Sequence, residues 1–181
     1  MKLFKNVDIC DLVSILEKGI LSLDASGNNN WERNKRAGNP TNVVYLFSPT
    51  GANNSFVKYG AALLEVDVPD AHENQLLERD YNQGNYTEFT VPKVAPKQIK
   101  AVYIPKLFQD WITLDDTIKS KITWCGIEAR VFHNGELVPA TAEDFAYLKN
   151  QNVTCANGWL YFRGVKENNH VVDYIDVNYK F

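Results

Sequence analysis

The sequence predicts an α+β fold with a mostly antiparallel sheet and a few short helices. Three observations support this class: short apolar or alternating runs of strand length recur along the chain, one amphipathic helix stands near the N-terminus, and Asn-, Gly- and Pro-rich turns separate the runs. Hydrophobic residues make up 45% of the 181 residues, which is enough for a substantial core and excludes a disordered chain.

The first predicted elements are a strand at 2–7 and a helix at 8–19. Residues 2–7 alternate well enough for a short strand. In 8–19 the apolar residues recur at helical spacing, Asp8 can cap the N-terminus, and Gly19 stands where a glycine ends many helices. A long loop follows at 24–42, and loops of this length in a compact domain are usually functional or disordered.

The remaining elements are predicted from periodicity and turn residues, with Asn134-Gly135 as the strongest hairpin signal. Strands are predicted at 43–47 and 61–68, with helical turns at 54–60 between them and a polar connection at 70–87 after them. Two further strands, at 86–91 and 99–104, lie on either side of an interruption at 92–96. The C-terminal part begins with a strand at 128–132 that turns at 133–136, continues with a helix at 141–148, and ends with strands at 159–162 and 171–177 that pair across a turn at 167–169.

The length predicts one domain over 1–181, and the hairpin and strand patterns near the end predict a β-rich C-terminal part at 119–181. No run approaches the roughly 18 consecutive apolar residues of a membrane span. The N-terminus also lacks the apolar region of a secretory signal. We therefore expect a cytoplasmic protein that does not contact membranes.

Metal-site and common nucleotide-binding motifs are absent from the sequence. His72-Glu73 lacks the second His of a zinc helix motif, and Cys10, Cys125 and Cys155 are far apart, so we expect buried or half-buried thiols and no metal site. The sequence contains no Gly-x-Ser-x-Gly elbow, Walker loop or Rossmann glycine fingerprint.

Three segments, taken in order, resemble the ADP-ribosyltransferase-like superfamily. Residues 3–20 resemble its opening strand and helix, 43–48 its second motif strand, and 88–100 its third, where a Glu opens a strand that runs into a Pro-containing turn and an Ile. The resemblance covers about residues 3–104. It implies split, mostly antiparallel sheets and an NAD-dependent mono-ADP-ribosyltransferase that transfers ADP-ribose from NAD to a macromolecular acceptor.

The resemblance implies that Glu88 is the catalytic residue. Cleavage of the nicotinamide–ribose bond of NAD passes through an oxocarbenium-like sugar, and a carboxylate at the ribose hydroxyls stabilises the developing positive charge. From its strand position alone, Glu88 would be read as a solvent-facing carboxylate, and the surrounding pattern favours the catalytic role over this alternative.

Further residues are candidate NAD contacts. Lys5 stands where family members usually have Arg or His, and lysine supplies a point charge without the bidentate fork of arginine. Tyr45 or Ser48 would shape the nicotinamide pocket, and Tyr59 could stack on nicotinamide. Each of these three could instead be a packing residue.

The predicted loop supplies another candidate contact region. Trp31 stands beside three cations, of which Arg33 and Arg36 are the candidate contacts to the pyrophosphate of NAD or to a nucleic-acid acceptor. A solvated charged face is the alternative. The formal charge of −3, from 19 Lys+Arg and 22 Asp+Glu, excludes a protein that binds nucleic acid through a net basic surface. It is compatible with a local site for an anionic dinucleotide.

The sequence does not specify which macromolecule accepts the ADP-ribose group. Family members that modify arginine place Glu or Gln two residues before the catalytic Glu, whereas this chain has Tyr86 there. Arginine transfer is therefore in doubt, and other protein side chains and nucleic-acid bases both stay open as acceptors. A bacterial toxin, a phage-borne effector and a housekeeping modifier all fit this chemistry.

Two alternatives compete with the transferase. The first is a catalytically inactive binding module of the same fold, motivated by Lys5 at the first motif, that recognises a protein or nucleic-acid partner. The second is a small hydrolase with carboxylate pairs among Glu65, Asp67, Asp70 and Glu73, although a solvated sheet face would carry such residues anyway.

Overall fold

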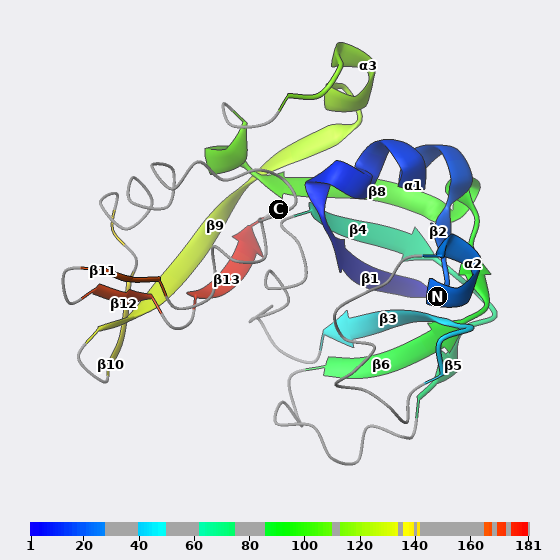
Figure 1. The fold of residues 1–181 in the computed structure, drawn as a ribbon, viewed down its shortest axis with the longest axis horizontal. Helices are drawn as coiled ribbons and strands as arrows, with labels where there is room; N and C mark the ends of the chain where they lie inside the picture. The colour runs from blue at the N-terminus through cyan, green and yellow to red at the C-terminus, as the bar shows by residue number, and fades with distance from the viewer. Residues whose placement is uncertain are drawn as a thin grey trace.

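A computed structural model describes residues 1–27, 40–49, 62–74, 86–109, 113–133, 136–139, 141, 165–167, 170–172 and 175–180. Within these ranges the chain forms a mostly antiparallel sheet with a few short helices, so the predicted α+β class is confirmed (Figure 1). The strands are β1 (Lys2–Val7), β2 (Ile20–Leu21), β3 (Val44–Pro49), β4 (Ala62–Asp67), β5 (His72–Glu73), β6 (Tyr86–Val91), β7 (Lys93–Val94), β8 (Ile99–Pro105), β9 (Ile122–His133), β10 (Glu136–Pro139), β11 (Val165–Glu167), β12 (His170–Val172) and β13 (Ile175–Lys180). The α-helices are α1 (Leu12–Lys18), α2 (Leu23–Ser26) and α3 (Asp116–Lys119), and the 3-10 turns are η1 (Ile9–Asp11), η5 (Pro96–Gln98) and η6 (Lys106–Phe108).

The main sheet of the described chain has the strand order β10-β9-β8-β4-β1-β3-β6-β5, with β13 also paired to β9. Its neighbours are antiparallel except for β8 and β9, which are parallel. Two short ladders, β2–β7 and β11–β12, lie outside this sheet.

The main sheet consists of two parts that join at one residue pair. β1 pairs with β4 along its whole length, and β3 pairs with β6 along its whole length. Between β1 and β3, in contrast, the register of the described residues is the single pair Phe4 opposite Phe47. β1 and β3 therefore diverge from each other on either side of this pair.

The predicted helix at 8–19 is confirmed, with η1 as its first turn and α1 as its body. Asp8 caps it, because its Oδ1 accepts a hydrogen bond of 3.0 Å from the backbone N of Cys10. Gly19 ends it at a φ of 84°, a conformation that glycine adopts without steric cost.

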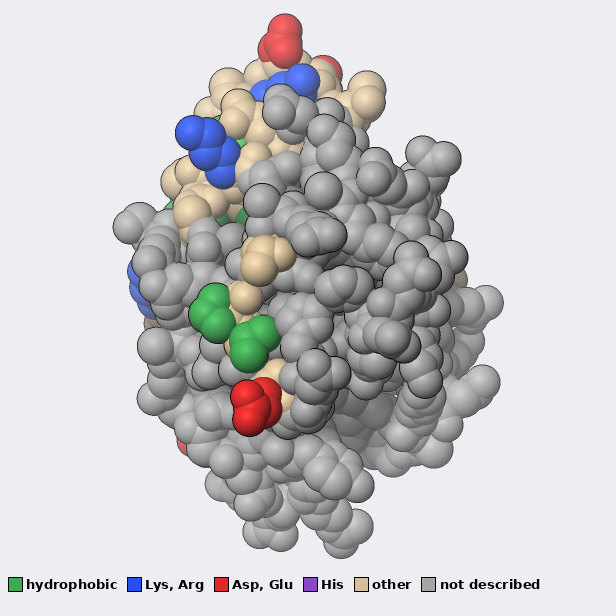
Figure 2. Space-filling view, turned by 90° about the vertical axis from the view of Figure 1, so that its left-hand side faces the viewer, with side chains coloured by type: hydrophobic (Ala, Val, Ile, Leu, Met, Phe, Trp, Pro, Cys, Tyr) green, Lys and Arg blue, Asp and Glu red, His purple; other side chains and the backbone are tan. Residues whose placement is uncertain are grey.

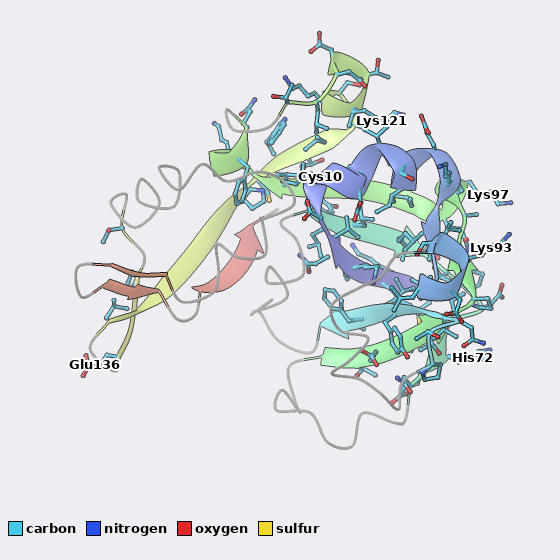
Figure 3. The ribbon with its side chains drawn as sticks, in the orientation of Figure 1. Cys10, His72, Lys93, Lys97, Lys121 and Glu136 are labelled. Carbon is cyan, nitrogen blue, oxygen red and sulfur yellow. The ribbon has the colours of Figure 1, made fainter. Side chains whose placement is uncertain are left out.

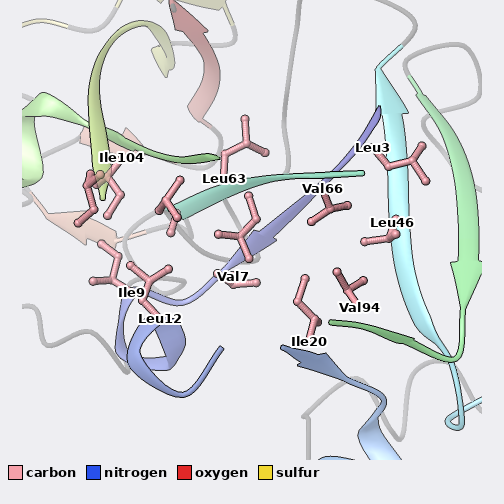
Figure 4. Packing of buried hydrophobic residues seen from close by; sticks show 14 of the residues in the cluster. Leu3, Val7, Ile9, Leu12, Ile20, Leu46, Leu63, Val66, Val94 and Ile104 are labelled. Carbon is pink, nitrogen blue, oxygen red and sulfur yellow. The ribbon is translucent and has the colours of Figure 1, made fainter. Parts of the chain in front are cut away.

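α1 and the β2–β7 ladder pack on one face of the main sheet. Leu12 of α1, Ile20 of β2 and Val94 of β7 belong to one buried cluster with Val7 and Leu46 of the sheet (Figure 4). Burial of these aliphatic side chains is the main stabilising contribution to this half of the molecule.

The C-terminal half is organised by β9. This strand runs parallel to β8 over residues 122–125 and then pairs with β13 over residues 126–131. It therefore joins the N-terminal and C-terminal parts of the chain in one sheet (Figure 1). On the side of the molecule shown in Figure 2, the described charged side chains gather mainly at the top, at the level of α3.

Several predicted boundaries are corrected by the structure. The loop predicted at 24–42 begins later, because the Ser22 Oγ accepts a hydrogen bond of 3.2 Å from Ala25 N and caps α2. The connection predicted at 70–87 contains β5, which pairs with β6. The strand predicted at 171–177 is divided between β12, which pairs with β11, and β13, which pairs with β9. Its predicted partner at 159–162 lies outside the described residues.

Some predictions lie outside the described residues. These are the helical turns at 54–60, the strand at 159–162, the helix at 141–148 after its first residue, and the loop at 31–36. Among the residues that the structure does describe, no helix has the length and hydrophobicity needed to cross a membrane.

Candidate functional site

Glu88 is a buried carboxylate near the start of β6. Glu88 is 6% exposed, and among the described residues only Asn6 and Ser22 are also both polar and buried. A buried carboxylate is costly unless it is hydrogen-bonded. The alternative of a solvent-facing strand carboxylate is therefore wrong for Glu88.

Asn74 supplies two hydrogen bonds to Glu88. Its side-chain Nδ2 donates to Glu88 Oε1 at 2.7 Å, and its backbone N donates to the Glu88 carbonyl oxygen at 2.8 Å. Asn74 directly follows β5, so its position opposite Glu88 continues the register in which Glu73 pairs with Phe89. Asn74 stands in no motif of the sequence, and only this long-range register reveals its role.

An aromatic pair lies on the same face of the sheet as Glu88. Register places Glu88 opposite Phe47, Phe47 opposite Phe4, and Phe4 opposite Glu65, and directly opposed residues share a face. The Phe4 and Phe47 ring centroids are 6.1 Å apart, with the rings tilted by 36°. Two carboxylates thus flank a phenylalanine pair in one row across four strands.

Glu65, at the other end of this row, has its own partners. Its Oε2 lies 3.0 Å from Lys2 Nζ and accepts a hydrogen bond of 3.0 Å from the Tyr103 hydroxyl. Lys2 Nζ also lies 5.4 Å from the centroid of the Phe4 ring. Burial, and after it the hydrogen bond to Glu65, raise the pKa of Tyr103.

The other carboxylates of the hydrolase hypothesis lie on the surface. Asp67, Asp70 and Glu73 are exposed, and Asp67 bonds to the N-terminal amino group at 2.8 Å. This is the distribution expected of a solvated sheet face, so these three carboxylates give the hydrolase hypothesis no support.

Lys5 and Tyr45 lie where β1 and β3 separate. Lys5 Nζ donates a hydrogen bond of 3.1 Å to the Tyr45 carbonyl oxygen, and the Tyr45 hydroxyl donates one of 2.7 Å to the Pro40 carbonyl oxygen. The Lys5 ammonium and the Tyr45 hydroxyl, both predicted to contact NAD, therefore donate to backbone carbonyl oxygens in this structure. Lys5 bridges the two parts of the sheet.

The candidate residues do not all lie on one side of the sheet. Tyr45 is two residues from Phe47 and shares its face with Glu88, whereas Lys5 and Ser48 directly follow the paired residues Phe4 and Phe47 and lie on the opposite face. The structure thus brings Tyr45 and Glu88 to one face. Tyr59, Arg33 and Arg36 lie outside the described residues.

A second group of titratable side chains surrounds the start of the helix. Burial, followed by the charge of Asp11, raises the pKa of Asp8 to about 6, and burial raises the pKa of Asp11. Cys10, which Figure 3 places at this end of the helix, is exposed, so the expected burial of this thiol is wrong. Cys125 is buried as expected, and burial raises its pKa to about 11.

The described residues contain no group of three or more His, Cys, Asp or Glu side chains that could hold a metal ion. The chain matches no family model, no curated protein and no solved structure.

Proposed function

We propose that the chain is an NAD-dependent mono-ADP-ribosyltransferase that transfers ADP-ribose to a protein side chain or a nucleic-acid base. The observation that carries the proposal is Glu88: a buried carboxylate, bonded by Asn74, at the strand position that the family resemblance assigns to the catalytic Glu. The junction of β1 and β3 at one pair is compatible with the split sheets of that family.

In the proposed reaction, the bond between the ribose C1 and the nicotinamide nitrogen breaks, and nicotinamide leaves with the bonding electrons. The Glu88 carboxylate stabilises the positive charge that develops on the ribose. A nucleophile of the acceptor then bonds to C1 and releases its proton. The products are nicotinamide, a proton and the ADP-ribosylated acceptor.

The face of the sheet that carries Glu88 suggests how NAD would be bound. Tyr45 shares that face and would shape the nicotinamide pocket. Lys5 and Ser48 lie on the other face and would reach NAD only where β1 and β3 separate. In this proposal, Tyr59 stacks on nicotinamide, and Arg33 and Arg36 contact the pyrophosphate or the acceptor.

The test is to incubate the protein with labelled NAD and a cell extract, and to measure both label transfer and nicotinamide release. We expect Glu88→Gln to lose about 100-fold or more in rate, the usual effect of removing one stabilising group from a transition state. Glu73→Gln is the matched control, because Glu73 is an exposed carboxylate on the neighbouring strand. A wild-type protein that neither transfers label nor hydrolyses NAD would exclude the proposal.

A second candidate function is a catalytically inactive binding module for a protein or nucleic-acid partner. It is favoured by Lys5, whose ammonium bonds to the Tyr45 carbonyl and lies on the face opposite to Glu88. Calorimetry with millimolar NAD separates the two functions. Absence of binding heat, together with a partner recovered by pull-down, would support the binding module.

A further inference from the structure

Asn74 holds Glu88 by two independent bonds. The backbone bond of 2.8 Å to the Glu88 carbonyl oxygen extends the pairing of β5 with β6 by one residue. The side-chain bond of 2.7 Å to Oε1 is additional, because strand pairing does not require it. One residue therefore fixes both the main chain and the carboxylate of Glu88.

The chemical nature of the Asn74 side chain suits a carboxylate that must stay charged. An N–H donor favours the ionised form of a buried carboxyl group over the protonated form. A Lys or Arg in the same place would do so too, but its positive charge would oppose the developing charge of a cationic sugar. A neutral amide orients the carboxylate without adding a positive charge of its own.

We propose that Asn74 is a positioning residue that keeps the Glu88 carboxylate ionised and aligned for ADP-ribosyl transfer. The catalytic part of this proposal rests on the transferase function proposed above. The structural part, that the Asn74 amide controls the ionisation of Glu88, does not depend on that function and is measured separately.

The principal variant is Asn74→Asp, which keeps the side-chain shape and the backbone bond but replaces the Nδ2 donor by a second carboxylate. Two adjacent carboxylates disfavour ionisation of each other. We expect the rate of transfer at neutral pH to fall up to about 100-fold, the loss that a displacement of about 1 Å at a reacting centre causes. We expect KM for NAD to change less than about twofold, because Asn74 acts on the transition state.

The pH dependence separates positioning from a general structural defect. In Asn74→Asp and Asn74→Ala, the acid limb of the profile of kcat against pH should move to higher pH. Asn42→Asp is the matched control, because Asn42 is exposed and gains the same charge, and its profile should match that of the wild type. Melting temperatures identify any variant that fails to fold.

Carboxyl carbon NMR gives the readout that does not require activity, with the Glu88 signal assigned by its loss in Glu88→Gln. We expect Glu88 to titrate at higher pH in both Asn74 variants than in the wild type. An unchanged Glu88 titration would overturn the inference, whether or not the protein turns over NAD. An inactive wild type in which Glu88 still responds to Asn74 would exclude the transferase function and its catalytic role for Asn74, but would retain the control of ionisation.

Discussion

The side-chain carboxylate of Asp8 is poorly solvated in the folded chain. Burial and the nearby charge of Asp11 raise its pKa from 3.8 to about 6, although a backbone hydrogen bond from Ile9 acts in the opposite direction. A carboxyl group with a higher pKa in the folded than in the unfolded state binds its proton more tightly when folded. Its contribution to stability is therefore fully present below about pH 4 and is lost as the pH rises through about 6.

We expect Asp8→Asn to be more stable than the wild type at pH 7 and closely similar to it near pH 4. Asn caps a helix as well as Asp does, so the cap is retained while the charge is removed. The gain at pH 7 should be about 1 kcal/mol, because partial exposure of Asp8 reduces the effect of the pKa shift. Urea unfolding between pH 4 and pH 7 measures the difference.

The matched control for Asp8→Asn is Asp70→Asn, which removes a carboxylate from an exposed turn. We expect it to show no comparable gain on raising the pH. If the stability of Asp8→Asn followed that of the wild type at every pH, the poorly solvated carboxylate would be ruled out as a source of pH dependence.

Glu88 could be selected from the sequence, but its environment could not. Its position before a Pro-containing turn carries the family resemblance, and both features are local. Its burial and its bond to Asn74 depend on which strands lie beside β6, and β3 and β5 come from distant parts of the sequence. Local periodicity contains no information on such partners, so Asn74 could only be found from the structure.

Gly19, between α1 and β2, is required by two features of the fold. Its φ of 84° and ψ of −177° lie in a region that is almost exclusive to glycine. In addition, a Cβ at this position would collide with the carbonyl oxygen of Val94, the residue that pairs with Ile20 in the β2–β7 ladder. The sequence predicted the helix end but not this close backbone approach.

We expect Gly19→Ala to lower the free energy of unfolding by about 2 kcal/mol or more, through backbone strain and displacement of β7. Gly27→Ala is the control, because Gly27 has a φ of 66° but open space around it. It should cost only about 1 kcal/mol. Urea unfolding of both variants tests the comparison, and equal losses would show that the contact with Val94 has no energetic effect.

The sequence predicts a strand where the hydrophobic pattern of that strand's own side chains is typical of one. β6 was predicted with its observed bounds, because its polar and apolar residues alternate over 86–91. β5 was not, since His72 and Glu73 are both exposed and only backbone pairing with β6 makes them a strand. Short edge strands of this kind lack the apolar periodicity on which prediction depends.

The order of strands in the main sheet depends on contacts between distant parts of the chain. β1 pairs with β4 on one side and meets β3 on the other, and no local pattern specifies either neighbour. The single residue pair between β1 and β3 could therefore not be predicted from the pattern of either strand. The placement of Lys5 and Glu88 on opposite faces was not expected at all, because it follows from the register across three strands.

Lys5 connects the two parts of the sheet, and this role can be separated from ligand binding. Its bond to the Tyr45 carbonyl replaces strand pairing where β1 and β3 diverge. We expect Lys5→Met, which keeps an apolar stem of similar length, to lower the free energy of unfolding by about 1 kcal/mol. Lys5→Arg should retain most of this stability, because a guanidinium can also donate to a carbonyl oxygen.

Urea unfolding measures both Lys5 variants, with Lys121→Met as the control for loss of an exposed lysine. NAD titration of the same proteins provides the second measurement. If Lys5 only connects the two parts of the sheet, its replacement by Met lowers stability, and NAD binding by the proposed transferase changes only through the position of β3. A Lys5→Met variant as stable as Lys121→Met, but with weaker NAD binding than Lys5→Arg, would instead identify the ammonium as a direct ligand of NAD.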